Sequence, residues 1–511
     1  MNRSRFTQQA WRCLAAIFIY AATHCAITAA AEDLVQERNE LTTKFAHQLA
    51  ELARKCDSQN EAELAAEVRK WAEPRDPHKI YLAALPEPGG DASQEKLVKA
   101  AEGSPLEQEF QKLRRAQAKQ YYTLARSAIR AQRASLAFEL VIDTLRENPD
   151  HPDARRLLGY VSYRNQWHTR YAVKRLRAGQ VWDSRFGWQT PANLARYEKG
   201  ERLYNNKWIS AEEESRLRSD IRRAWTIETE HYSVRTNHSL EAGVALGIRL
   251  ERLYSAWQQT FVRYYATQAE LDQLFAGGGL PRVDEHRHLV VYYRNRNEYR
   301  RALEGKIPPD IETTGIYMGD QRTAFFFAPP TPTPDGESPA DYSTLYHEAA
   351  HQLFSESRPV VPDVGRESNF WIIEGIACYF ESFEAHPSYY TLGGALTERL
   401  QAARYRALVD NFLFPLRDLT QLGMSQLQRS PQIGTLYSQS AGMTHFLIHY
   451  DSGRYRDALV AYLLAVYTGR ARPGTLAQLT GTSYDELDRE YREFLESLPD
   501  SEAPVPETAK G

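Results

Sequence analysis

Two histidines and a glutamate in the stretch HEAAH have the residue types and the spacing of a metal site. His347 and His351 are four positions apart, so on a helix both imidazoles lie on one face and can reach one ion. Glu348 projects beside them, where a carboxylate can contact the water of the site without being a ligand. Apolar residues such as Leu345 and Leu353 favour a helix here. The alternative is a core helix that carries two histidines by chance.

A further acidic residue lies in the stretch WIIEGIACYFE, at positions 371–381. Glu374 is near the start of the helix predicted there, with 22 residues between it and His351. Two histidines from one helix and a glutamate from the next form a His₂Glu site with an open fourth position, a ligand set of catalytic zinc. The small residues Gly375 and Ala377 beside the ligand would let the two helices approach closely. The pattern therefore predicts a Zn²⁺ site with His347, His351 and Glu374 as ligands.

HEAAH followed by WxxEGxAxYFE resembles the gluzincin metallopeptidases of the peptidase MA clan, the group of aminopeptidase N and leukotriene A4 hydrolase. Closer still, HEAAHQLF with WIIEGIACYFE resembles a bacterial family of uncharacterised, secreted peptidase-MA-like proteins. The resemblance is close over 340–385 and looser over 225–460. It implies that His347, His351 and Glu374 bind zinc and that Glu348 is the general base.

Two more residues take a role from this resemblance. LYSQSAGMTHFL, at 436–447, resembles the segment in which aminopeptidase-type gluzincins place a tyrosine that stabilises the oxyanion, and Tyr437 falls on that tyrosine. Gln439 and Ser440 stand where those enzymes have Lys and Gly. Glu381 matches an acidic position of those enzymes, where it could orient a ligating histidine. Alternatively, Glu381 is a helical residue that faces solvent.

One departure from the aminopeptidase pattern limits the reaction. Those enzymes carry a Gly-x-Met-Glu-Asn strand whose glutamate binds the free amine of the substrate. The corresponding stretch here runs from Gly315 to Asp320 and reads GIYMGD, without the glutamate. Exopeptidase action at a free N-terminus is therefore not supported, although an edge strand there could still bind an extended peptide.

Other potential ligands have simpler explanations. His445 and His449 are also four apart, but no glutamate follows His445, so we expect core packing. His286 and His288 alternate at the start of a strand, so we expect them to face solvent. Cys378, one turn beyond Glu374, is expected to be a small buried residue rather than a fourth ligand.

The first thirty-one residues have the pattern of a secretory signal peptide. Arg3, Arg5 and Arg12 form a positive region, residues 13–22 are apolar, and alanines precede Glu32. The apolar run is shorter than the ~20 residues that span a bilayer. We therefore expect an exported protein, whether periplasmic, envelope-associated or extracellular, without a stable membrane span after cleavage. An uncleaved N-terminal anchor is the alternative.

Composition is that of a folded, soluble protein. The chain has 511 residues, 42% hydrophobic and 25% charged, with a net charge of −3. This length predicts about three domains. There is no basic excess of the kind that nucleic-acid binding requires. After the signal only Cys56 and Cys378 remain, so no disulfide framework is expected.

The predicted fold class is α+β and predominantly helical, with an N-terminal helical, tetratricopeptide-like region and a thermolysin-like zinc peptidase domain that holds a small β-sheet subdomain. The tetratricopeptide resemblance rests on 137–161, where NPDHPDA matches the turn between helical pairs.

Three Trp-containing stretches recur at spacings of 21 and 20, at Trp167, Trp188 and Trp208, each followed by Thr or Ser two residues later. They predict three small strand-plus-helix units capped by those hydroxyls. The predicted regions are 1–31 signal peptide, 32–165 helical region, 166–222 Trp-containing linker, 223–500 peptidase-like domain (223–337 β-rich, 338–500 helical and zinc-binding) and 501–511 tail.

Periodicity gives the expected elements. Helices are predicted over 32–72, 105–133, 135–147 and 239–266, strands within 226–237, 288–295 and 315–328, a loop over 74–91, and a helical chain from 342 almost to the end.

The leading functional hypothesis is a secreted zinc metallopeptidase that hydrolyses peptide bonds by Glu348-assisted attack of zinc-bound water on a peptide or protein substrate. A different hypothesis is a catalytically inactive, peptidase-like scaffold that binds a partner protein through its helical N-terminal half. A third is a metallohydrolase that acts on a non-peptide amide or ester.

Overall fold

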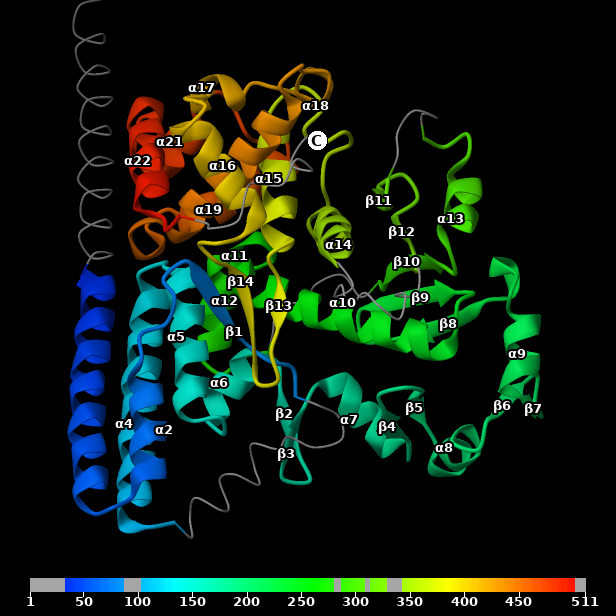
Figure 1. Cartoon of the computed structure of the whole chain (residues 1–511), viewed down its shortest axis with the longest axis horizontal. Coiled ribbons are helices and arrows are strands. Elements are labelled where there is room, and N and C mark those ends of the chain that lie inside the picture. The colour runs from blue at the N-terminus through cyan, green and yellow to red at the C-terminus, as the bar shows by residue number, and fades with distance from the viewer. Residues whose placement is uncertain (1–32, 87–102, 280–285, 308–312, 329–341, 501–511) are drawn as a thin grey trace, which may run out of the picture. The chain divides into compact units, whose positions relative to one another are not determined.

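The structure, a computed structural model, describes residues 33–86, 103–279, 286–307, 313–328 and 342–500. The predicted signal peptide and the predicted tail lie outside these residues. The chain forms two compact units (Figure 1). The described residues of the first unit are 33–74, 103–157 and 268–279, and those of the second are 75–86, 158–267, 286–307, 313–328 and 342–500.

The first unit is helical. Its helices are 33–58, α2 (Ala62–Ala72), α4 (Pro105–Arg130), α5 (Ala134–Glu147), α6 (Pro152–Leu157) and α12 (Gln268–Phe275). The single helix expected over 32–72 is wrong, because Asn60 has a φ of 62° and the chain turns there. The helices predicted over 105–133 and 135–147 are confirmed. Phe45, Leu49 and Phe110 are buried in a shared core, which matches the apolar spacing that predicted helices here.

A buried carboxylate lies in the core of this unit. Glu147 accepts hydrogen bonds from the indole of Trp71, at 3.0 Å, and from Arg114, at 3.3 Å. Arg114 also stacks on the Trp71 ring. Burial raises the pKa of Glu147, while Arg146 and Arg114 act in the opposite direction. The polar groups in this helical core are therefore satisfied by one another.

The second unit begins with the three predicted repeats, each of which is a two-stranded hairpin followed by a short helix. The units are β2 (Val161–Tyr163), β3 (Gln166–His168) and α7 (Arg170–Arg177); β4 (Val181–Asp183), β5 (Gly187–Gln189) and α8 (Pro191–Tyr197); and β6 (Glu201–Tyr204), β7 (Lys207–Ser210) and α9 (Ala211–Leu217). The side chains of Thr169, Thr190 and Ser210 cap the three helices. The predicted strand-plus-helix units and their caps are confirmed.

A five-stranded mixed sheet follows, in the order β11-β12-β10-β9-β8. The strands are β8 (Trp225–Glu228), β9 (Tyr232–Thr236), β10 (His288–Tyr293), β11 (Gly315–Met318) and β12 (Thr323–Phe327). β9, β10 and β12 are parallel, whereas β8 and β11 run antiparallel to their neighbours. Helix α10 (Leu240–Thr260) connects toward β10 and packs on β8 and β9 (Figure 1). β11 is an edge strand, and it lies against the helix that carries HEAAH.

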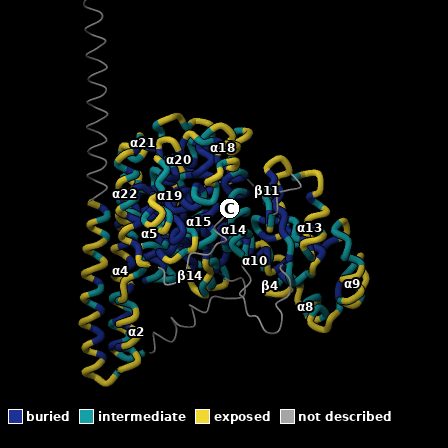
Figure 2. Tube along the Cα trace, turned by 45° about the horizontal axis from the view of Figure 1, so that its top comes forward, coloured by how far each residue is buried: buried dark blue, intermediate teal, exposed yellow. Residues whose placement is uncertain are grey.

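The remainder of this unit is largely helical. Its main helices are α14 (Ser343–Glu356), α15 (Phe370–Phe380), α16 (Glu398–Leu408), α17 (Leu416–Leu419), α18 (Met424–Gln428), α19 (Ile433–Gly453), α20 (Arg456–Tyr467) and α22 (Tyr484–Ser497). All residues of α15 are buried, as are most of α19 (Figure 2). These helices form the core that holds the candidate site.

The sequence-based prediction missed a small antiparallel sheet. Strand β1 (Lys79–Ala83) lies inside the expected loop, and β13 (Glu384–Ala385) and β14 (Tyr389–Gly393) interrupt the region expected to be helical. β1 pairs with β14 and β14 with β13. The fold class is nevertheless α+β and predominantly helical, as predicted. No helix of the described residues has both the length and the apolarity needed to cross a membrane.

Candidate metal centre

Helix α14 presents two different faces. Leu345, Ala349 and Leu353 are buried, as the spacing of apolar residues predicted. On the other side, His347 and His351 have side chains that are 15% exposed. The apolar side packs the helix against the unit, so that the histidines are held at a fixed place.

Helix α15 places Glu374 opposite these histidines, and α14 and α15 pack on each other. Gly375 was expected to make room for α14, and the atoms nearest to a Cβ at this position belong to a third helix, α19. A Cβ atom at Gly375 would lie 2.4 Å from Thr444 Oγ1 and 2.6 Å from the carbonyl oxygen of Ser440, both on α19. The glycine thus permits close packing behind the ligand.

The three predicted ligands meet at one point. His347 Nε2 lies 3.2 Å from His351 Nε2, and Glu374 Oε2 lies 3.5 Å and 3.8 Å from these two nitrogens. Ligand atoms of a tetrahedral zinc site with bonds of about 2.0–2.1 Å are separated by about 3.3–3.4 Å. The observed triangle has almost these dimensions. These residues could therefore hold a metal ion.

A hydrogen-bonded chain fixes the ring of His347 from behind. His347 Nδ1 lies 2.9 Å from Glu381 Oε1. Arg399 on α16 contacts both oxygens of that carboxylate, at 2.8 Å and 3.1 Å. Donation from Nδ1 to Glu381 leaves the Nε2 lone pair facing the site. The structure thus favours the orienting role of Glu381 over a solvent-facing position.

The acid–base properties of the ligands follow from burial and charge. Burial lowers the pKa of His351 to about 4, which keeps its imidazole neutral at pH 7. Burial acts in the same direction on His347, but hydrogen bonds with Cys378, Glu374 and Glu381 outweigh it and raise the pKa of His347 well above its usual range. The acidic partners that stabilise a proton on His347 would also stabilise a bound cation.

Glu348 lies beside the predicted ligands but is not one of them. Its Oε2 accepts a hydrogen bond of 2.8 Å from the backbone amide of Tyr317, in the edge strand β11. Burial raises the pKa of Glu348 to about 7. A carboxylate that is held in place and titrates near neutrality has the properties of a general base.

Tyr437 also reaches the centre. It lies in α19, and its hydroxyl is close enough to the Glu374 carboxylate and to the Gln428 side chain of α18 for both groups to influence its pKa. Burial, with the charge of Glu374, raises its pKa. The phenol therefore keeps its proton and can donate it in a hydrogen bond.

A second group of possible ligands shares one residue with the first. His347, Cys378 and Glu381 also have donor atoms close together. Cys378 is a buried free thiol, as is Cys56 in the other unit. Because Arg399 already forms two hydrogen bonds with Glu381, a cation on that side would meet an existing positive charge. The first group is therefore the better metal site.

The other histidines of the sequence pattern lie in the core. His445 and His449 are buried, and His449 Nε2 lies 3.0 Å from the Tyr379 hydroxyl, in line with the packing role expected for them. The solvent-facing position expected for His288 is wrong, because its ring is buried and lies 2.8 Å from the Glu356 carboxylate. His286 is exposed as expected.

Three groups that contact the site residues were not predicted from the sequence. They are the guanidinium of Arg399, the side-chain amide of Gln428 and the backbone amide of Tyr317. No motif marks Arg399 or Gln428, since each acts through a contact that only the packing of α16 or α18 creates. The Tyr317 amide is carried by any non-proline residue, so no residue type could reveal it.

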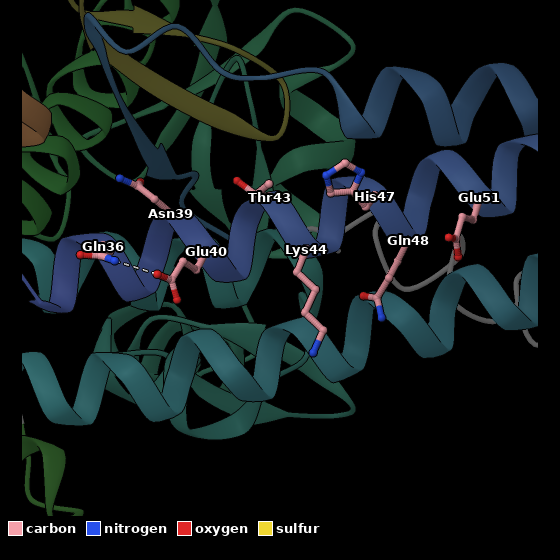
Figure 3. A pocket seen from close by; sticks show the side chains of 8 residues that line it. All are labelled: Gln36, Asn39, Glu40, Thr43, Lys44, His47, Gln48 and Glu51. Atoms are coloured by element: carbon pink, nitrogen blue, oxygen red, sulfur yellow. Dashed lines mark hydrogen bonds between the residues drawn. The ribbon is translucent and has the colours of Figure 1, made fainter.

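A hollow in the first unit has a different character. Its described lining residues all come from helix 33–58, among them Gln36, Glu40 and His47 (Figure 3). Gln36 donates a hydrogen bond of 2.9 Å to Glu40. The lining belongs to neither of the two groups of possible metal ligands found among the described residues, and both of those groups lie in the second unit.

Comparison with known proteins finds a match over part of the chain. Residues 341–469 match a family model described as a protein of unknown function (DUF1570). No curated protein matches the chain. The matched segment includes all of the predicted ligands, Glu348 and Tyr437.

Proposed function

We propose that the protein is a zinc-dependent metallopeptidase of the gluzincin type. The observation that carries this proposal is the convergence of His347 Nε2, His351 Nε2 and Glu374 Oε2, within 3.2–3.8 Å of one another, beside a separate and oriented Glu348. A buried structural cluster has no need of a fourth group held next to the ligands at a pKa of about 7.

In this proposal each residue of the site has a separate role. His347, His351 and Glu374 would hold the zinc ion, which when bound would activate water and polarise a substrate carbonyl. Glu348 accepts the proton of the attacking water and passes it to the leaving amine. Tyr437 keeps its proton and donates a hydrogen bond to the oxyanion that develops on the substrate.

The architecture around the site supports the same proposal. An antiparallel edge strand, β11, lies against the HEAAH helix, and the next helix supplies the glutamate. This arrangement supports a thermolysin-like peptidase domain. For the first unit we propose a tetratricopeptide-like region that binds a protein partner, supported by the long antiparallel helices α4 and α5 and the turn from α5 to α6. Export remains part of the proposal, based on the signal-like N-terminus.

The proposal is tested by replacing the general base. Glu348→Gln should retain the metal, because Glu348 is not a ligand, and should lower kcat for peptide hydrolysis about 10²–10⁴-fold. A peptide library serves as substrate, and metal content is measured on the same sample. Glu367→Gln, at a side chain that is 91% exposed, is the control and should match the wild type. Undiminished turnover by Glu348→Gln would falsify the assignment.

A further inference from the structure

A pocket with two distinct walls includes Gln428, a residue that lies close to Tyr437 of the candidate metal centre. One wall is part of the segment that joins α14 to α15 and contributes Asp363 and Arg366. The other wall is α18 and the residue after it, with Met424, Gln428 and Arg429 among the lining. Both walls belong to the second unit and to the region that carries the site.

Backbone hydrogen bonds hold the two walls of the pocket together. The amide of Met424 donates to the Gly365 carbonyl at 2.9 Å, and the amide of Phe370 donates to the Leu422 carbonyl at 3.1 Å. Gly423 lets the walls meet, because a Cβ atom there would lie 2.2 Å from the Arg366 carbonyl oxygen. The pocket is thus preformed, which lowers the entropic cost of binding.

Gln428 connects this pocket to the metal centre. Its side chain lines the pocket and lies close to the Tyr437 hydroxyl, which in turn lies close to the Glu374 carboxylate. A substrate whose scissile carbonyl lies next to Tyr437 would therefore have a neighbouring group within reach of the pocket.

The charges in the pocket favour an anion. Arg366 is paired with Asp363, at 3.0 Å. Arg429 is exposed, and within the described residues no ion pair or side-chain hydrogen bond engages its guanidinium. A guanidinium matches the planar geometry of a carboxylate and can bind it through two hydrogen bonds. Met424, also exposed, offers an apolar surface beside this charge.

We infer that this pocket is a substrate subsite in which Arg429 binds a carboxylate group of the peptide. The inference rests on the proposed peptidase function and adds a substrate class to it: peptides with a negative charge close to the scissile bond. That charge comes either from an Asp or Glu side chain or from the C-terminal carboxylate, and both present the same chemistry to Arg429.

Peptide binding to the full-length Glu348→Gln protein tests the subsite without turnover. Fluorescein-labelled peptides are compared in pairs by fluorescence anisotropy, with Glu or Gln at successive positions and with a free or amidated C-terminus. We expect one acidic form to bind at least about tenfold more tightly than its neutral partner. The pair that shows the difference identifies the source of the carboxylate.

A second substitution assigns the effect to the pocket. Adding Arg429→Gln should abolish the preference for the acidic form, whereas Arg429→Lys should retain part of it. The matched control is Arg417→Gln, an exposed arginine on α17 that lies outside the pocket lining, and it should leave the preference unchanged. Equal binding of every acidic and neutral pair, or a preference that survives Arg429→Gln, would overturn the subsite.

Hydrolysis by the wild-type protein separates this inference from the proposed function. Cleavage of peptides without any dependence on acidic groups overturns the subsite and leaves the peptidase function standing. Failure to cleave any peptide, with an Arg429-dependent preference in binding, overturns the peptidase function and supports the carboxylate site.

Discussion

Arg399 is linked to His347 through the Glu381 carboxylate. Glu381 contacts His347 Nδ1, on the side of the imidazole ring opposite to Nε2, which faces the other predicted ligands. Arg399 holds both oxygens of Glu381, and Glu381 accepts from His347 Nδ1. Hydrogen bonds of this kind orient a ligand and raise its basicity. The residue-scale consequence is that metal affinity depends on a side chain that does not touch the metal.

Replacing Arg399 with Ala should weaken metal binding about 10–100-fold, because Glu381 loses its anchor and His347 its fixed orientation. The dissociation constant for Zn²⁺ is measured by competition with a chromogenic chelator. Arg404→Ala, on the same helix but bonded to the Leu495 carbonyl, should bind zinc as the wild type does. Equal zinc affinity of Arg399→Ala and the wild type would contradict the positioning role.

At this scale the sequence was informative where chemistry restricts residue type and spacing. HEAAH and the glutamate 23 positions after its second histidine identified residues that the structure places within 3.8 Å of one another. Tyr437 also lies at the site, although Gln439 and Ser440 differ from the residues that aminopeptidase-type gluzincins have there. Arg399 could not be found in this way, because an arginine 18 positions after Glu381 has no preferred partner until α16 is packed.

The contact of α15 with α19 depends on one glycine. Gly375→Ala would place a methyl group 2.4 Å from Thr444 Oγ1 and 2.6 Å from the Ser440 carbonyl oxygen. Overpacking of this kind costs about 1–3 kcal/mol. We expect a lower thermal unfolding temperature and, because Glu374 precedes the glycine, a lower zinc affinity. An unchanged melting curve would show that α19 can move away at no cost.

The junction between α17 and α22 gives a pH-dependent contribution to stability. Asp488 lies near the backbone amide of Leu416, with both of its oxygens at 3.2 Å. Burial raises the pKa of Asp488 to about 6, and the charges of Asp485 and Asp418 act in the same direction. An unfolded chain has a pKa of about 3.9 at this residue. The folded state therefore binds the proton more tightly, and this stabilisation is complete below pH ~4 and lost as the pH rises through ~6.

Asp488→Asn cannot ionise and should avoid that loss. The free energy of unfolding of the variant minus that of the wild type should therefore increase by about 1 kcal/mol from pH 4 to pH 8. This figure is discounted for partial solvent exposure. Urea denaturation at a series of pH values measures the difference. A difference between the two proteins that does not vary with pH would contradict the raised pKa.

Elements with local signals were predicted well, and elements that need distant partners were not. The amphipathic helices α4 and α5, the three hairpin–helix units and strand β10 each have a pattern within their own residues. β1 was missed because it is short and lies among prolines, and its partner β14 begins more than 300 positions further along the chain. Pairing at that separation leaves no trace in local periodicity.

At the scale of the whole molecule, the residues of the candidate metal centre all lie in the second unit. A ligand that binds only the folded state stabilises the unit that holds it, by about 4 kcal/mol at a free concentration of 1,000 Kd. Removal of zinc should therefore shift the unfolding of the second unit to lower temperature and leave that of the first unchanged. Calorimetry with and without a chelator measures this, and hydrogen exchange assigns each transition. Equal shifts in both units would contradict a centre confined to one.

The central claim is that His347, His351 and Glu374 form a zinc site, and it is tested most directly by the metal content of the purified full-length protein. Mass spectrometry of the wild type and of His351→Ala, both reconstituted with Zn²⁺ and dialysed, gives the stoichiometry. We predict about one zinc ion per wild-type chain and none that withstands dialysis in the variant. A wild-type protein without zinc, or a variant that retains as much zinc as the wild type, would contradict the account.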